Sequence, residues 1–213
     1  MQRNSVIVAA KRTPIGAFQG QFSSLSASDL GASVIKQVLI DAKIQPDQID
    51  EVIMGNVLSA GQGQAPARQA TMKSGCPNTI ESLTINKMCG SGLKAIMLAD
   101  QAIRSGDADV IVAGGMESMT NSPYLIENAR SGQRLGHGKL VDSMIHDGLW
   151  DVYNDKHMGN CAEMLAAERN FTRQSQDEYA IDSYNKSISA IKNKIFSTEI
   201  VPVEVNQRKG KSI

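Results

Sequence analysis

The chain has 213 residues, with 22 basic and 22 acidic side chains that cancel to a formal net charge of zero at pH 7. This length suffices for one large domain or two small ones, and the balanced charge provides no field that would attract nucleic acid or an acidic membrane surface. No apolar run approaches the roughly 20 residues that a membrane span requires. The three cysteines, Cys76, Cys89 and Cys161, form no C-x-x-C pair and no even framework, which is typical of a reducing compartment. The first apolar run begins at Ser5, which leaves no room for a signal peptide, so we expect a cytoplasmic protein.

Strands and helices are predicted to alternate through the first half of the chain. Short apolar runs, typical of strands covered on both faces, lie at residues 5–10, 51–57, 82–85 and 110–113. Apolar residues at helical spacing predict helices over residues 26–43, 65–74 and 90–105. The third helix is apolar on nearly every side, which predicts burial on more than one face. The alternation favours an α/β layer with a largely parallel sheet.

The pattern changes after Met119. Residues 120–157 hold proline, glycine and scattered charge with weak periodicity, which indicates a long functional excursion. Two helices and a final strand are predicted to follow, at residues 160–169, from Thr172 or Ser175 to about 193, and at 200–205. We therefore expect an amino-terminal α/β domain over residues 1–119 and a second, helical domain over residues 120–213.

Cys89 lies where a predicted strand ends and a predicted helix begins, with Gly90 and Gly92 beside it. Small residues there let the backbone turn sharply and let another group approach the sulfur. Free amide N–H groups and the positive end of the helix dipole favour a thiolate, which is the form that attacks a carbonyl carbon. Most free cysteines are instead inert, buried small hydrophobes. The Gly-Ser-Gly run at a strand-to-helix junction favours the reactive interpretation and predicts acyl transfer.

The residues around Cys89 resemble the acyl-enzyme signature of the thiolase family, and most of all its acetyl-CoA acetyltransferase branch. The matching residues around the cysteine are Ile85, Asn86, Cys89, Gly90, Ser91, Gly92, Leu93, Ala95, Ile96 and Ile103. Three further segments match the same family, at residues 12–16, 114–119 and 157–159. The second of these segments reads Gly114, Gly115, Met116, Glu117, Ser118, Met119. The resemblance runs from the first predicted strand to the last residue.

The resemblance implies a thiolase-like fold: an amino-terminal α/β half with a mixed, mostly parallel sheet, and an inserted helical loop domain that is cut short. It implies that Cys89 carries the acyl group and that its backbone N–H is one donor to the oxyanion. It also implies that Leu149, His157 and Met158 line the pocket for the acyl group and the pantetheine end of coenzyme A, and that Tyr184 lies near the coenzyme A site. Two alternatives stay open, His157 as a hydrogen-bonded structural histidine and Met158 as core filler.

The implied mechanism needs residues that this sequence lacks. In the family, an activating histidine and a second cysteine belong to a carboxyl-terminal half that resembles the first half in fold, and none of that half is among the 213 residues. We therefore expect this chain on its own to be inactive or nearly so. We also expect poor solubility, because a helix that is apolar on all faces would leave one flank against water. The resemblance implies coenzyme A as a substrate rather than a tightly bound cofactor, no metal ligand, and a homodimer or homotetramer when full length.

Two other functions stay open. A ketoacyl synthase shares the fold and the cysteine nucleophile, but it uses two histidines and a carrier-bound malonyl donor. Residues 116–119 and 157–159 favour the thiolase family over it. A non-catalytic or half-site subunit would instead supply half a site to a separately encoded second chain, and it would co-purify with a chain of similar size.

Overall fold

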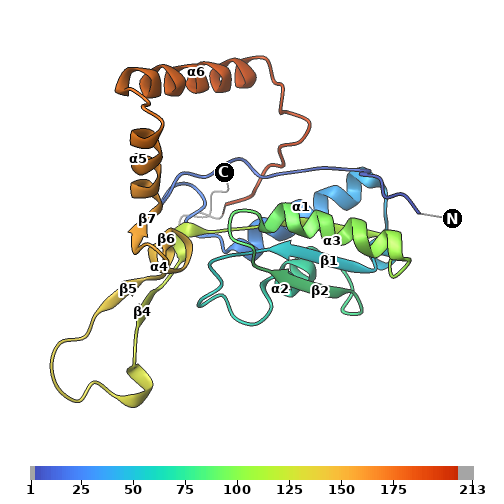
Figure 1. Ribbon diagram of the computed structural model, residues 1–213. Coiled ribbons are helices and arrows are strands. Elements are labelled where there is room, and N and C mark those ends of the chain that lie inside the picture. The colour runs from blue at the N-terminus through green and yellow to red at the C-terminus, as the bar shows by residue number, and fades with distance from the viewer. Residues whose placement is uncertain (1–2, 206–213) are drawn as a thin grey trace. The chain divides into compact units, whose positions relative to one another are not determined.

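The computed structural model describes residues 3–205 and divides into two compact units (Figure 1). Unit 1 comprises residues 3–148 together with 201–205, and unit 2 comprises residues 149–200. This division falls after Gly148, and the domain boundary predicted after Met119 stays a prediction. The end of the second predicted domain, residues 206–213, lies outside the described residues.

Three parallel strands form the sheet of unit 1 within the described residues. β1 (Glu51–Gly55) lies at the centre, with β2 (Glu81–Ile85) on one side and β3 (Ile111–Gly115) on the other. The register pairs the last residue of β1 with the last residues of both neighbours, so all three strands end at the same level. Each of them was expected from its apolar run, and the parallel α/β architecture is confirmed.

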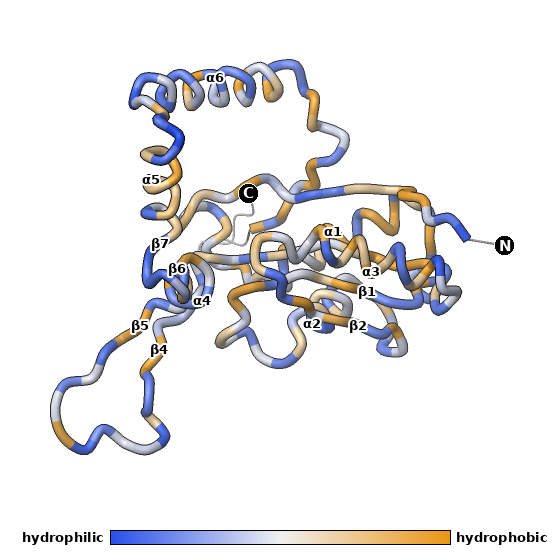
Figure 2. Tube along the Cα trace, viewed as in Figure 1, coloured by the Kyte–Doolittle hydropathy of each residue, from blue (hydrophilic) through white to orange (hydrophobic). Residues whose placement is uncertain are grey.

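Helices cover both faces of this sheet. α1 (Ala27–Ala42) and α2 (Pro66–Lys73) pack on the face formed by Val52 and Met54, where the main hydrophobic cluster gathers. α3 (Ser91–Ser105) contacts β1 and β3 on the opposite face, because successive side chains of a strand alternate between the faces. Figure 2 shows the resulting pattern, in which the central strand β1 is largely hydrophobic and the helices carry both hydrophobic and hydrophilic residues.

The rest of the described chain consists of short elements and two longer helices. In unit 1 these are η1 (Pro46–Gln48), η2 (Met119–Asn121), β4 (Tyr124–Ile126), η3 (Ala129–Ser131), β5 (Leu140–Asp142) and α4 (Ser143–Gly148). In unit 2 they are β6 (Trp150–Asp151), β7 (Lys156–His157), α5 (Met158–Glu168) and α6 (Arg173–Lys192). The pairs β4–β5 and β6–β7 are antiparallel and form two separate two-stranded sheets, whereas the three-stranded sheet is parallel throughout. No helix within residues 3–205 is long and apolar enough to cross a membrane.

Side-chain caps define where α1 and α6 begin. The Ser26 hydroxyl accepts a hydrogen bond from the backbone N of Asp29 at 3.2 Å, and the Asp29 carboxylate accepts one from the backbone N of Ser26 at 2.9 Å. This reciprocal pair is a capping box. Of the two candidate starts for α6, Thr172 is the one used, since its hydroxyl accepts a hydrogen bond from the backbone N of Ser175 at 3.1 Å.

The predictions of strands at residues 5–10 and 200–205 are wrong, because neither segment forms a strand. Residues 6–8 are between 66% and 79% exposed, although their apolar run is typical of a buried strand. A strand needs a neighbour that satisfies its backbone groups, and no strand lies beside this segment within the described residues. The second segment contributes a backbone hydrogen bond from the N of Val201 to the O of Arg12, at 2.8 Å.

α3 is buried on one face only. Ala95 and Ala99 are buried, whereas Leu93, Ile96 and Met97 are exposed. The prediction that this helix is covered on more than one face is therefore wrong for the part of the chain that the structure describes. Apolar periodicity shows which residues avoid water, but it does not show whether a partner for each face is present.

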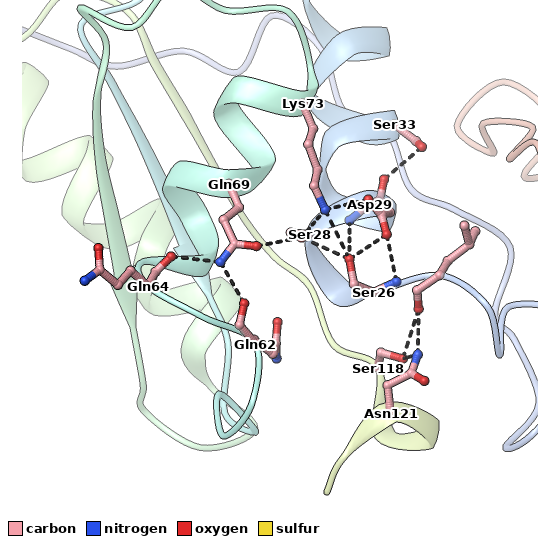
Figure 3. A network of polar contacts seen from close by, with 11 residues as sticks. Ser26, Ser28, Asp29, Ser33, Gln62, Gln64, Gln69, Lys73, Ser118 and Asn121 are labelled. Carbon is pink, nitrogen blue, oxygen red and sulfur yellow. Dashed lines mark hydrogen bonds and ion pairs between the residues drawn. The ribbon is translucent and has the colours of Figure 1, made fainter.

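Asp29 also links the start of α1 to α2 (Figure 3). The Nζ of Lys73 lies 2.6 Å from the Oδ1 of Asp29 and 2.8 Å from the Ser28 hydroxyl. Partial burial alone would raise the pKa of the Asp29 carboxyl, but hydrogen bonds from Lys73 and Ser26 outweigh it and hold the pKa below its ordinary value. The stability that Asp29 contributes is therefore fully present above about pH 4, and it is lost as the pH falls through the lowered native pKa.

Asp29→Asn is expected to lower the free energy of unfolding by about 1 kcal/mol at pH 7, because it weakens the capping box and removes the partner of Lys73. The deficit should shrink as the pH falls and the native carboxyl becomes protonated in the parent. Urea denaturation at pH 7 and over an acid series measures both effects. The control is Asp182→Asn, which removes an exposed ion pair with Lys186 and should change the stability less than Asp29→Asn does. A deficit for Asp29→Asn that is independent of pH would contradict the ionic role.

Candidate active site

The carboxyl edge of the sheet brings together three segments of the chain, residues 55–58, 86–91 and 114–117. Hydrogen bonds continue beyond the strands: the N of Asn56 donates to the O of Ile85 at 3.0 Å, and the N of Met116 donates to the O of Gly55 at 2.9 Å. In open parallel sheets, ligands bind at this edge. The candidate site is built here, around Cys89.

Cys89 occupies a tight turn between β2 and α3, so the predicted strand-to-helix junction is confirmed. The preceding residue, Met88, has a φ of 49°, in the left-handed region that side chains rarely adopt. The Oδ1 of Asn86 accepts a hydrogen bond from the backbone N of Met88 at 3.0 Å. The Ser91 hydroxyl donates to the O of Met88 at 2.6 Å and accepts from the N of Lys87 at 2.8 Å. Side chains on both sides of the turn therefore hold the strained residue before the cysteine.

The Cys89 side chain is exposed, whereas Cys76 is buried and Cys161 is half-buried. The alternative of a buried cysteine therefore does not hold for Cys89 within the described residues, while its reactivity stays a prediction. α3 begins without a side-chain cap, since Gly90 has no side chain and the Ser91 hydroxyl serves the turn. An uncapped helix start favours negative charge nearby, which suits an attacking sulfur and an oxyanion. The role of Cys89 as nucleophile stays a prediction of the sequence.

Glycines let the start of α3 approach the sheet closely. A Cβ atom on Gly55 would lie 2.5 Å from the Cβ of Ser91 and 2.8 Å from the N of Gly92, which is too close for any side chain. A Cβ atom on Gly115 would lie 3.4 Å from the Cα of Gly92. The first turn of α3, which directly follows Cys89 and Gly90, is therefore seated on the ends of β1 and β3.

A partly buried carboxylate, Glu117, follows the end of β3. It accepts hydrogen bonds from the Nδ2 of Asn56 at 2.7 Å, the N of Val57 at 2.9 Å and the N of Leu58 at 3.2 Å. Burial raises the pKa of Glu117, although these three hydrogen bonds act in the opposite direction. All three donors are neutral amides, so none of them compensates the carboxylate charge with a full positive charge.

The four residues expected to contact the acyl-CoA substrate belong to unit 2, whereas Cys89 belongs to unit 1. The β6–β7 pairing places Leu149 close to Met158, whose N donates to the O of Leu149 at 2.9 Å, and His157 precedes Met158 directly. Tyr184 lies on α6 and is 73% exposed. The structure therefore groups three of the four residues, and their contacts with coenzyme A stay predictions. Met158 is itself exposed, so the alternative of plain core filler is wrong within the described residues.

His157 caps the amino terminus of α5. Its Nδ1 accepts a hydrogen bond from the backbone N of Gly159 at 3.0 Å. This is the structural role that the sequence left open. It leaves Nε2 for a second partner, so a cap and a contact with substrate are compatible.

His157→Ala is expected to lower the free energy of unfolding by about 1 kcal/mol, because α5 loses its only side-chain cap in the described structure. His157→Asn should restore most of the loss, since Asn is a favoured cap residue. Hydrogen exchange of the first amides of α5 measures the effect locally. Equal protection in the parent and in His157→Ala would show that the cap contributes nothing.

Neither Ser91 nor Glu117 is assigned a role by the sequence pattern, although both lie in segments that match the thiolase family. A charged residue two positions beyond the end of a strand is the signal that points to Glu117, because such a side chain must find partners at the sheet edge. Ser91 lies at a helix start, where a hydroxyl usually caps the helix. Here it stabilises the preceding turn instead, which only the three-dimensional structure reveals.

The fold and the site define an α/β protein with an exposed candidate cysteine nucleophile at the carboxyl edge of a parallel sheet. Within residues 3–205, no group of His, Cys, Asp and Glu side chains gathers that could hold a metal ion. Comparison with known families goes further. The family model described as thiolase, N-terminal domain, matches residues 5–213, and the chain belongs to the thiolase family.

Curated relatives agree with this assignment. The chain is 54% identical over 208 residues to the acetyl-CoA acetyltransferase of Pseudomonas aeruginosa, a match that covers 98% of this chain and 53% of the relative. It is 54% identical over 205 residues to the acetyl-CoA acetyltransferase of Cupriavidus necator, covering 96% and 52%. A probable acetyl-CoA acyltransferase of Staphylococcus aureus is 51% identical over 208 residues, covering 98% and 53%. The chain thus spans about half the length of the curated relatives it matches, and the resemblance to the amino-terminal half of the family is confirmed.

Proposed function

We propose that this chain provides the acyl-accepting cysteine of an acetyl-CoA acetyltransferase, which condenses two acetyl-CoA molecules to acetoacetyl-CoA or cleaves a 3-ketoacyl-CoA with coenzyme A. The observation that carries the proposal is the exposed Cys89 thiol, on a turn that Asn86 and Ser91 hold at the carboxyl edge of the sheet. The names of the relatives from Pseudomonas aeruginosa and Cupriavidus necator support the same reaction.

In the first step, the Cys89 thiolate attacks the carbonyl carbon of acetyl-CoA and a tetrahedral oxyanion forms. The bond between that carbon and the coenzyme A sulfur then breaks, coenzyme A leaves as a thiolate, and the acetyl group remains on Cys89 as a thioester. Amide N–H groups around the start of α3 donate to the oxyanion. One thioester replaces another, so the step is close to balanced in energy.

In the second step, the acetyl group moves either to the thiol of coenzyme A or to the α-carbon of a second acetyl-CoA. The acceptor must lose a proton in both cases, and the resemblance assigns that transfer to a histidine and a second cysteine that are not among these residues. The proposed turnover therefore belongs to a protein that also contains them. Leu149, His157 and Met158 form the pocket for the acyl group and pantetheine, and Tyr184 lies near coenzyme A, which is a substrate. The proposal includes a cytoplasmic homodimer or homotetramer.

The test compares two proteins: the 213-residue chain, and the same chain joined to the remaining half of the Pseudomonas aeruginosa relative (the joined protein). Each is incubated with acetyl-CoA, and peptide mass spectrometry locates the acetyl group. Coenzyme A-dependent cleavage of acetoacetyl-CoA measures turnover. We expect acetylated Cys89 and turnover in the joined protein, and little or no turnover by the chain alone.

A folded joined protein that leaves Cys89 unacetylated would refute the proposal. Acyl transfer to a carrier-bound malonyl group, with no cleavage of acetoacetyl-CoA, would instead identify a ketoacyl synthase. Turnover that appears only when a separate second chain of similar size is added would identify a half-site subunit. Robust cleavage by the 213-residue chain alone would overturn the prediction that it is inactive.

A further inference from the structure

A chain of hydrogen bonds connects Glu117 to the turn that carries Cys89. Val57, whose backbone N donates to the Glu117 carboxylate, also accepts through its O a long hydrogen bond from the Nδ2 of Asn86, at 3.4 Å. The Oδ1 of the same Asn86 accepts from the backbone N of Met88 at 3.0 Å. Glu117 is thereby linked through Val57 and Asn86 to the left-handed residue that precedes the cysteine.

The same segment after β1 is held from a second side by Gln62. Its Nε2 donates to the Oδ1 of Asn56 at 3.1 Å and to the O of Leu58 at 2.7 Å. Gln62 is fixed in turn by Gln69 of α2, whose Nε2 donates to the O of Gln62 at 2.7 Å. Figure 3 shows Gln69 between this loop and Ser28 at the start of α1. Residues 56–58 are therefore clamped between Glu117 and a hydrogen-bond network that reaches α1 and α2.

The chemistry of the clamp explains why a carboxylate stands at position 117. A charged group that is partly buried costs stability, so its presence needs a compensating role. Glutamine has the same length, but its amide NH₂ is a donor and would face the N–H groups that Glu117 now accepts. Of side chains with this length, a carboxylate alone accepts from three N–H donors at once without presenting a donor of its own.

We propose that Glu117 is a positioning residue for Cys89: its carboxylate fixes residues 56–58 and, through Asn86, the turn that presents the thiol. The claim that the position of the Cys89 thiol matters for acetyl transfer rests on the proposed function. The positioning itself can be measured without acyl transfer, because the reactivity of the thiol toward a small alkylating agent depends on the same turn.

The three cysteines provide an internal assay. The 213-residue chain is alkylated briefly with iodoacetamide, and mass spectrometry measures the extent of alkylation at each cysteine. The ratio of alkylation at Cys89 to that at Cys161 is the readout, and the buried Cys76 stays unmodified as long as the fold is intact. Glu117→Gln is expected to lower the Cys89-to-Cys161 ratio at least about threefold while Cys76 stays protected, since a loosened turn no longer holds the thiol in one position at the start of α3. Glu117→Asp keeps the carboxylate and should recover part of the ratio.

The matched control is Glu81→Gln, the same chemical change at the opposite end of the sheet, which should leave the ratio unchanged. If Glu117→Gln exposes Cys76, Asn86→Ala replaces it as the test, because it cuts the link to Met88 and leaves the three hydrogen bonds of Glu117 in place. We expect Asn86→Ala to lower the Cys89-to-Cys161 alkylation ratio by the same factor. A ratio equal to or above that of the parent, with Cys76 protected, overturns the proposal.

Acetyl transfer supplies the second readout. In the joined protein, Glu117→Gln should lower the rate of Cys89 acetylation about tenfold without changing the acetyl-CoA concentration at half saturation, since the residue acts through the turn and does not bind substrate. An effect on half saturation alone would contradict a positioning role. If the parent takes up no acetyl group while Glu117→Gln still lowers the alkylation ratio, the proposed function fails and the positioning role stands.

Discussion

Cys89→Ser is expected to abolish acetyl transfer in the joined protein, with the rate of acetyl incorporation falling by at least about 10³-fold. Serine fits the same exposed position, so the fold is preserved. Its hydroxyl is hardly ionised near neutral pH, and without an adjacent base it is a far weaker nucleophile than a thiolate. The measurement is the initial rate of acetyl transfer from acetyl-CoA, followed by intact-protein mass spectrometry.

The matched control is Cys161→Ser. Cys161 is the other partly accessible thiol, and its Sγ lies 3.9 Å from the Oδ2 of Asp151, too far for a strong hydrogen bond. This variant should accept acetyl groups at the parent rate. If Cys161→Ser loses acetylation and Cys89→Ser retains it, the nucleophile has been assigned to the wrong cysteine.

Gly55→Ala is expected to destabilise unit 1 by about 1–3 kcal/mol, the usual cost of overpacking a close contact. The added Cβ would lie 2.5 Å from the Cβ of Ser91 and 2.7 Å from its carbonyl carbon. These atoms belong to the start of α3 and cannot rotate away, so the helix must move off the sheet. Urea denaturation measures the loss, and the alkylation ratio of Cys89 to Cys161 reports whether the turn moves with the helix.

Gly114→Ala is the control for this prediction, because it adds the same methyl group to the neighbouring strand. Its nearest contact would be the Sδ of Met54 at 3.7 Å, an ordinary distance to a flexible side chain. We expect a change of less than about 1 kcal/mol. Equal stability of the two variants would show that α3 is not seated on the sheet through Gly55.

Local signals in the sequence located most of unit 1. The capping box at Ser26 and the apolar run before Cys89 each depend on neighbours within a few residues, so the start of α1 and the end of β2 could be predicted. The junction that carries Cys89 follows from the same runs. The apolar segment at residues 5–10 shows the limit of this reasoning, since a strand requires a partner that no local pattern can supply.

The polar part of the site could not be predicted in the same way. Glu117 and Asn56 are 61 positions apart in the chain, and their contact exists only because β1 and β3 pair in one register. The left-handed Met88 carries no sequence signal, since methionine has no preference for that conformation. The sequence leaves two roles open for His157, and its hydrogen bond from the N of Gly159 depends on the fold around the start of α5.

The assembly of the carboxyl edge has a consequence for folding. Parallel strands pair across long sequence separations, and such contacts form slowly because the entropy of closing large loops must first be overcome. The clamp around residues 56–58 therefore cannot close before β3 has docked beside β1. An extended or half-collapsed chain would leave Cys89 in an ordinary flexible segment, so the turn that presents its thiol should take its final form only when unit 1 has completed folding.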